Sequence, residues 1–86
     1  MARIGGQIEE LAALKQRFDK EGSTVHELTS AIDGQLNNTW WVGPASDRFR
    51  QAWQSEYKPA LAKLQNALVV AGNEVAKRRQ ALIDVG

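Results

Sequence analysis

Apolar side chains recur every seven residues in the first half of the chain. The series runs Ile4, Leu11, Phe18, Val25 and Ile32. Leu14 and Leu28 lie three residues after members of this series, and most residues between are polar. In an α-helix this spacing collects the apolar side chains on one face. The pattern therefore predicts an amphipathic helix over residues 4–39.

Gly22 interrupts this helix without changing its phase. A glycine inside a helix costs about 1 kcal/mol relative to alanine. Phe18 and Val25 remain seven residues apart across Gly22, whereas a loop would normally reset the phase. We therefore expect a single helix, with Gly22 as the place where a bend is easiest.

Turn signals end the first pattern. Asn37, Asn38, Gly43 and Pro44 fall within eight residues, a composition typical of a turn. Pro44 suits the first position of a new helix, where its missing N–H would have no intrahelical partner. The sequence thus predicts a turn over residues 40–43.

The second half is again helical. Four apolar residues lie seven apart, namely Leu61, Leu68, Val75 and Leu82. Phe49, Trp53, Tyr57, Leu64 and Ala71 broaden this stripe, and the small residues Ala60, Ala67 and Ala71 suggest a close helix neighbour. Pro59 removes one hydrogen bond and crowds the preceding turn. We predict a helix over residues 44–84 with a kink near residues 55–58.

The predicted fold is an all-α antiparallel two-helix hairpin in one domain, residues 1–86. Each helix is about 55 Å long, and a short connection makes them antiparallel. The stripes are wider than one helix–helix seam, so a second hairpin is expected to complete a four-helix bundle. The residues expected in the hairpin or dimer interface are Ile4, Leu11, Phe18, Val25, Ile32, Phe49, Trp53, Leu61, Leu64, Leu68, Val75 and Leu82.

Composition supports association over other means of stabilisation. A chain of 86 residues has room for one small domain. It has no cysteine and one histidine, His26, so disulfides and thiolate or imidazole metal clusters are not available. A small domain without them usually relies on a partner.

Charge and hydropathy exclude several classes of function. The net charge is +1, from 11 basic and 10 acidic residues mixed along the chain, which argues against nucleic-acid binding. No stretch approaches the roughly 20 apolar residues of a transmembrane helix. The N-terminal residues lack the apolar core of a signal peptide.

No catalytic constellation is present in the sequence. His26 is the only candidate base for a serine nucleophile, and the scattered carboxylates form no Glu-x-x-His pattern. We therefore expect a binding protein and not an enzyme, with no metal and no cofactor.

Two adjacent tryptophans, Trp40 and Trp41, stand at the predicted tip. Successive helical residues point about 100° apart, so one indole can pack inward while the other faces out. Two roles remain open. The tryptophans either close the end of the core with Trp53, or form a contact surface, because tryptophan is favoured at interface anchors.

The tip also carries a resemblance. Trp41-Val42-Gly43 matches a Trp-X-Gly signature between two helical segments, followed by Phe49, Trp53 and Pro59-Ala60-Leu61. In these features the chain resembles, over essentially its whole length, the WXG family. These are small, early-secreted-antigen-like proteins of type VII (ESX or Yuk) secretion systems in actinobacteria and Firmicutes.

The resemblance implies a hairpin that forms a homodimer, or a heterodimer with another WXG-family protein. Such proteins fold in the bacterial cytoplasm and are secreted without a cleaved signal peptide. They act as effectors, as escorts or as components of export. By analogy, Trp41 and Gly43 would form the turn and half of a recognition feature for the secretion ATPase.

The chain departs from the family at its C-terminal end. The family has a Tyr-x-x-x-Asp/Glu element there, whereas this chain has Gln80 four residues before Asp84. Three explanations of the missing tyrosine are open: a heterodimer partner carries it, the signal is degenerate, or the sequence is trimmed. The alternative function is a cytoplasmic helical adaptor or antitoxin-like inhibitor with no role in export.

Overall fold

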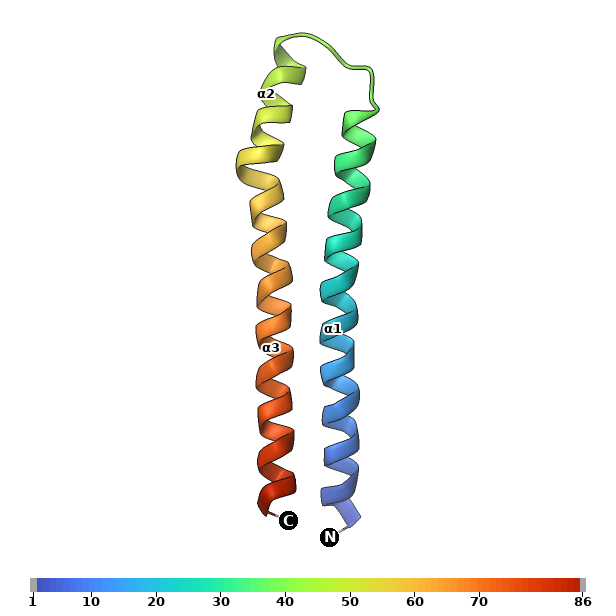
Figure 1. The fold of residues 1–86 in the computed structure, drawn as a ribbon, viewed down its shortest axis with the longest axis vertical. Coiled ribbons are helices and arrows are strands. Elements are labelled where there is room, and N and C mark those ends of the chain that lie inside the picture. The colour runs from blue at the N-terminus through green and yellow to red at the C-terminus, as the bar shows by residue number, and fades with distance from the viewer. Residues whose placement is uncertain (1, 86) are drawn as a thin grey trace.

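Two long helical arms lie antiparallel, joined at one end by a short loop (Figure 1). The computed structural model describes residues 2–85, and the side chains from residue 5 onward. The first arm is α1 (Ala2–Asn37); the second runs through α2 (Pro44–Ala52), the π-helical turn η1 (Trp53–Tyr57) and α3 (Lys58–Val85). Residues 2–85 contain no β-strand. The predicted helical hairpin is confirmed.

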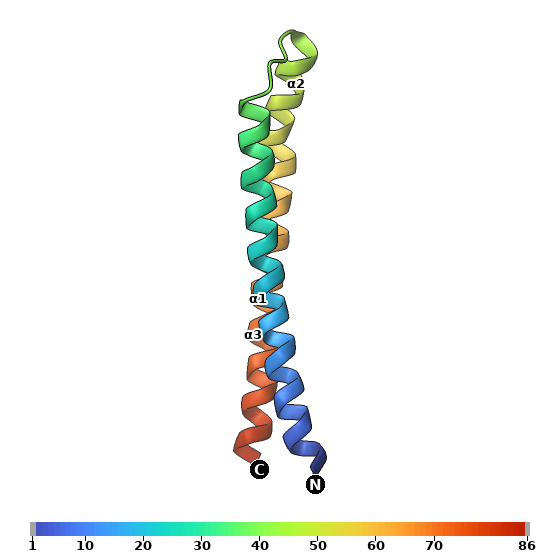
Figure 2. The same ribbon diagram turned by 90° about the vertical axis from the view of Figure 1, so that its right-hand side faces the viewer.

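The loop between the arms is slightly longer than the predicted turn. Helix α1 ends at Asn37, where the Thr39 N–H donates to the Leu36 carbonyl at 3.2 Å and tightens the last turn. The second arm begins at Pro44, and the Asp47 N–H donates to the Gly43 carbonyl at 3.0 Å. The connection therefore spans residues 38–43. The start of α1 and the end of α3 lie together at the opposite end of the hairpin (Figure 2).

Two glycines let the arms approach closely. Gly22 lies buried within an unbroken α1, and a Cβ added there would be 3.8 Å from Cγ2 of Val69. At Gly72 an added Cβ would be 3.1 Å from the Cβ of Phe18. Gly22 is therefore a contact position between the helices. Gly72 supplies the close approach that the sequence suggested for the alanines, of which Ala60 and Ala67 are exposed.

The disturbance expected near Pro59 takes the form of a widened turn. The Lys58 N–H donates to the carbonyl of Trp53, five residues earlier instead of four. Pro59 has no N–H to offer the Ser55 carbonyl, and its ring crowds the turn before it. A π-helical turn relieves this crowding while the arm continues into α3.

The hairpin has very little interior. It measures 65 × 18 × 12 Å, and its radius of gyration is 19.3 Å, against about 12 Å for a compact domain of this length. Of the apolar side chains described, only those of Val25 and Trp53 are buried. The large apolar side chains in the rest of the seam are half-buried, namely those of Ile8, Leu11, Phe18, Leu36, Leu61, Leu68, Val75 and Leu82.

Glycine-to-alanine substitutions distinguish an open glycine position, Gly34, from a closely packed one, Gly72. At Gly34 an added methyl group would meet nothing within 4 Å, so Gly34→Ala should raise the free energy of unfolding by about 0.5–1 kcal/mol. Gly72→Ala should forfeit that gain, because the Cβ of Phe18 is fixed to its backbone and overpacking costs about 1–3 kcal/mol. Chemical denaturation followed by circular dichroism measures both. Equal stabilisation by the two substitutions would contradict the close contact.

Candidate functional site

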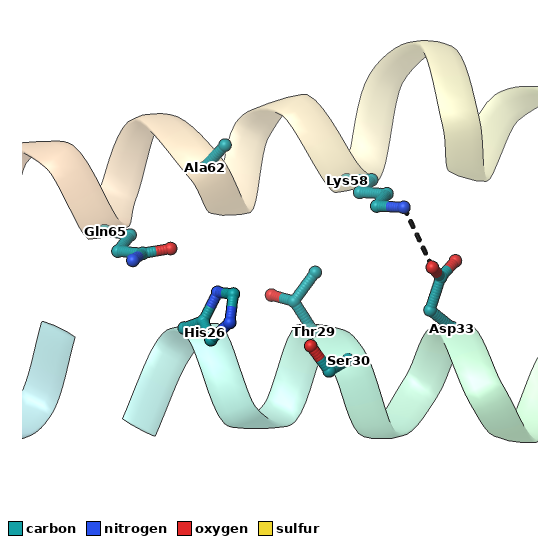
Figure 3. A pocket seen from close by; sticks show the side chains of 7 residues that line it. All are labelled: His26, Thr29, Ser30, Asp33, Lys58, Ala62 and Gln65. Atoms are coloured by element: carbon teal, nitrogen blue, oxygen red, sulfur yellow. Dashed lines mark hydrogen bonds and ion pairs between the residues drawn. The ribbon is translucent and has the colours of Figure 1, made fainter. Parts of the chain in front are cut away.

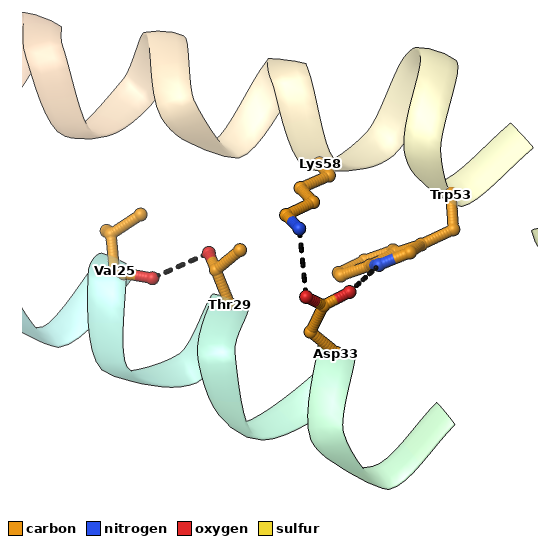
Figure 4. Close-up of polar contacts among 5 residues, drawn as sticks. All are labelled: Val25, Thr29, Asp33, Trp53 and Lys58. Carbon is orange, nitrogen blue, oxygen red and sulfur yellow. Dashed lines mark hydrogen bonds and ion pairs between the residues drawn. The ribbon is translucent and has the colours of Figure 1, made fainter. Parts of the chain in front are cut away.

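A polar cluster joins the two arms near the tip end of the seam. The Asp33 carboxylate accepts the Trp53 Nε1–H at 2.8 Å and an Nζ–H of Lys58 at 2.8 Å (Figure 4). Within residues 5–85, Asp33–Lys58 is the one ion pair between the arms; the others join residues four apart on one helix. The Trp53 side chain is buried. The cluster therefore fixes which part of the second arm lies opposite Asp33.

The π-helical turn explains how Trp53 and Lys58 reach the same carboxylate. Residues five apart in a regular α-helix point about 140° away from each other. In η1 the hydrogen bond spans five residues, so one turn separates Trp53 from Lys58 and both face α1. The irregular turn is thus what assembles the cluster.

The cluster favours a charged Asp33. The hydrogen bond from Lys58, and then that from Trp53, lower the pKa of the Asp33 carboxyl below its ordinary value of 3.8. Opposite charge and donated hydrogen bonds both stabilise the ionised form. Asp33 is therefore a structural anion at neutral pH, held by both arms.

A polar groove runs beside this cluster along one side of the seam (Figure 3). It is lined by His26, Thr29, Ser30, Asp33, Lys58, Ala62 and Gln65. The Asp33 carboxylate bonds Lys58 and Trp53, and within residues 5–85 no hydrogen bond joins it to His26. Among the described residues, no group of three potential metal ligands occurs. The groove therefore presents hydrogen-bonding side chains from both arms.

The tip loop is held by a network around Arg50. The Ser46 hydroxyl donates to the Trp41 carbonyl at 2.7 Å and accepts the Arg50 Nε–H at 3.0 Å. The two remaining guanidinium nitrogens donate to the carbonyls of Leu36 at 2.8 Å and Thr39 at 3.0 Å. Ser46 is only 1% exposed. These four bonds tie the loop to the ends of both arms.

Trp40 and Trp41 lie in the tip loop outside the helices, and both are exposed, to different extents. Trp41 packs against Phe49, with ring centroids 5.7 Å apart, and is 41% exposed. Trp40 is 92% exposed. Trp53, expected as a partner of the tip tryptophans, instead lies over Asp33. Gly43 has φ 116° and ψ 174°, a region open essentially to glycine alone, which accounts for the glycine of the Trp-X-Gly signature.

Exposed apolar residues gather on the side of the seam away from the polar groove. Leu28 lies about 200° around α1 from His26 and Ser30, and Leu64 lies about 200° around α3 from Ala62. Each therefore faces away from the groove. Residues at matching helical spacing extend this surface, and Phe49 packs between Trp41 and Tyr57. We define the apolar face as Leu14, Leu28, Ile32, Trp41, Phe49, Tyr57 and Leu64, all of which are exposed.

The residues expected at an interface fall into two groups. Three of them lie on the apolar face, namely Ile32, Phe49 and Leu64. The others whose side chains are described are buried or half-buried between the arms, namely Leu11, Phe18, Val25, Trp53, Leu61, Leu68, Val75 and Leu82. The side chain of Ile4 lies outside the described residues. Trp41 and Gly43 are both in the tip loop.

Sequence reasoning missed the polar residues that organise these sites. Ser46 and Arg50 are four residues apart just after Pro44, a spacing that places them on one helix face, but nothing marked their partners in the loop. Asp33 lies eight residues after Val25, near the phase of the apolar stripe, among residues whose polarity indicates a solvated surface. The available signal for the cluster was the charge of Asp33 at a position close to the phase of the apolar stripe.

Comparisons of the chain with protein-family models, curated proteins and solved structures find no match. In the described part of the chain, every helix lacks an apolar stretch of membrane-spanning length. The geometry of the tip, the Asp33 cluster and the apolar face therefore carries the functional argument.

The Asp33 cluster predicts a loss of stability in acid. Because the folded pKa of Asp33 is lowered, its contribution is present above the ordinary value and is lost as pH falls through the folded pKa. Wild-type melting temperature should fall below about pH 4, and Asp33→Asn should melt lower at pH 7 with a shallower acid limb. Thermal denaturation between pH 7 and pH 2 tests this.

Asp84→Asn, at a carboxylate that bonds Gln80 on its own helix, is the control and should keep the wild-type acid limb. Parallel acid limbs for wild type and Asp33→Asn would show that the cluster does not stabilise the hairpin.

Proposed function

We propose that this chain is a small, early-secreted-antigen-like protein of a type VII secretion system, which acts by binding other proteins. The supporting observation is the position of Trp41-Val42-Gly43. This signature forms part of the loop that joins two antiparallel helical arms, and Gly43 has a backbone conformation that requires glycine. The proposed roles are effector, escort or component of the export process.

A second hairpin is proposed to cover the apolar face, giving a four-helix bundle. Leu14 and Ile32 mark its extent along α1, a span of about 27 Å at 1.5 Å per residue. Exposed apolar surface of this length is unusual in a protein that acts alone. The partner is a second copy of the chain or another WXG-family protein.

The secretion ATPase is the proposed reader of the tip. Trp41 and Gly43 supply one half of the recognition feature in the family that the chain resembles. The tyrosine of the other half is replaced by Gln80, whose amide donates to Asp84 at 3.0 Å. Tyr57 lies in η1, far along the chain from this position. A heterodimer partner that carries the tyrosine would complete the signal.

The proposed course is folding in the bacterial cytoplasm followed by secretion without a cleaved signal peptide. The alternative is a cytoplasmic adaptor or antitoxin-like inhibitor that binds its target through the same apolar face. Gln80 in place of tyrosine favours this alternative.

Sedimentation tests the association. The purified chain should sediment as a dimer at micromolar concentration, and Leu28→Glu or Leu64→Glu should shift it toward monomer, because each buries a charge in the proposed interface. Val70→Glu is the matched control: Val70 is 58% exposed and lies outside the apolar face. A stable, well-folded wild-type monomer would contradict the proposal.

Export tests the pathway. The chain should appear in culture supernatant, and deletion of the secretion ATPase should retain it in the cytosol. Trp41→Ala should reduce export while lowering stability by less than the roughly 3–5 kcal/mol of a fully buried tryptophan, since Trp41 is 41% exposed. Quantitative blotting of both fractions measures export. Retention in the cytosol whether or not the ATPase is present would favour the adaptor.

A further inference from the structure

We propose that Ser46 and Arg50 are positioning residues that hold the tip loop in one conformation, so that Trp40 is presented as the anchor for the partner protein. This inference rests on the proposed function and deepens it. It assigns direct contact with the secretion ATPase to Trp40 and Val42, which we call the tip surface. Trp41, which packs against Phe49, then has a supporting role.

The clamp at the tip is unusually complete for an exposed loop. Arg50 donates through all three guanidinium nitrogens, to Ser46, Leu36 and Thr39. Leu36 belongs to the last turn of α1, where carbonyls lack helical partners and a positive charge is favoured. Ser46 in turn donates to the Trp41 carbonyl. The backbone on both sides of Trp40 is therefore bound to one side-chain network.

The division between the tryptophans selects Trp40 as the anchor. Trp41 already contacts Phe49, whereas Trp40 is 92% exposed and Val42 is 74% exposed. A large apolar ring left in water on a fixed backbone gains much on entering a pocket, and the loop loses little conformational freedom on binding. Within the tip loop, Trp40 and Val42 are thus the apolar side chains with most surface left to bury.

The chemistry of the tip fits an apolar protein pocket. The charged residues at the start of α2 are Asp47, Arg48 and Arg50, so the tip has two basic residues and one acidic residue and lacks the cluster of about four to eight basic residues that attracts anionic lipid surfaces. The tip surface consists of one indole and one valine, which matches a single pocket better than a broad bilayer. The pocket should be lined by aliphatic or aromatic side chains, since tryptophan anchors pair with such sites.

Binding to the purified cytoplasmic ATPase domains tests the anchor, using the full-length dimer or heterodimer. Trp40→Ala should raise the dissociation constant at least about 30-fold, as expected of a hot-spot residue, without changing the melting temperature. Val70→Ala, distant from the tip, should keep wild-type affinity. With 5-fluorotryptophan incorporated, the fluorine resonance of Trp40 should shift on adding the ATPase domains, while that of Trp53 should not.

Arg50 variants test the clamp separately. Arg50→Ala should speed amide hydrogen exchange over residues 39–42 and weaken binding roughly tenfold, because the loop must then be ordered on binding. Arg50→Lys keeps the charge but not the planar fork, and should give intermediate values of both. Weaker binding without faster exchange would overturn the positioning role.

The outcomes distinguish this inference from the proposed function. Normal affinity of Trp40→Ala together with lost affinity of Trp41→Ala would overturn the assignment of the anchor and leave the pathway intact. Absence of any binding by the wild-type protein would overturn both. A Trp40 resonance that shifts with phosphatidylglycerol vesicles and not with the ATPase domains would overturn the protein pocket.

Discussion

Two helices share a single line of contact, and this limit governs the rest of the structure. A helix in a bundle is shielded on two or more sides, whereas each arm here has one neighbour. Only Val25 and Trp53 become buried among the described apolar side chains, although apolar residues occupy a wide stripe on both arms. The hairpin therefore has well-formed helices and a thin interior, and the apolar face remains in contact with water.

Polar contacts fix the alignment of the two arms, which so small a core does not determine. Apolar seams with seven-residue spacing specify their alignment weakly, because each repeat places another apolar side chain at an equivalent position. The Asp33 carboxylate accepts hydrogen bonds from two donors on the opposite arm, and such a match is lost on any shift. At the tip, Arg50 and Ser46 do the same for the loop. The side chains of Asp33 and Lys58 are partly exposed, so a shift would forfeit the matched hydrogen bonds without burying a charge, and these bonds favour one alignment of the arms.

The sequence was most informative where periodicity decides the outcome. The seven-residue spacing predicted both arms, and the short connection predicted their antiparallel arrangement. The phase retained across Gly22 indicated one continuous helix. The loop was predicted two residues too short, because its ends depend on carbonyl contacts made by Arg50 from the other arm. Pro59 marked the right place for an irregularity, but proline chemistry does not distinguish a kink from a π-helical turn. The Asp33 cluster could not be predicted, since it depends on the alignment of two segments distant in sequence.

The π-helical turn keeps the two halves of the second arm in phase, so that both face α1. Residues 53–57 accommodate one residue more than a regular turn would. In a regular α-helix the same residues would rotate everything before this turn by about 100° relative to α3. The aromatic residues of the tip would then leave the face they share with Leu64. Deleting one residue within this turn would restore an ordinary helix and keep both halves facing α1, whereas deleting one residue elsewhere in the arm would misalign them.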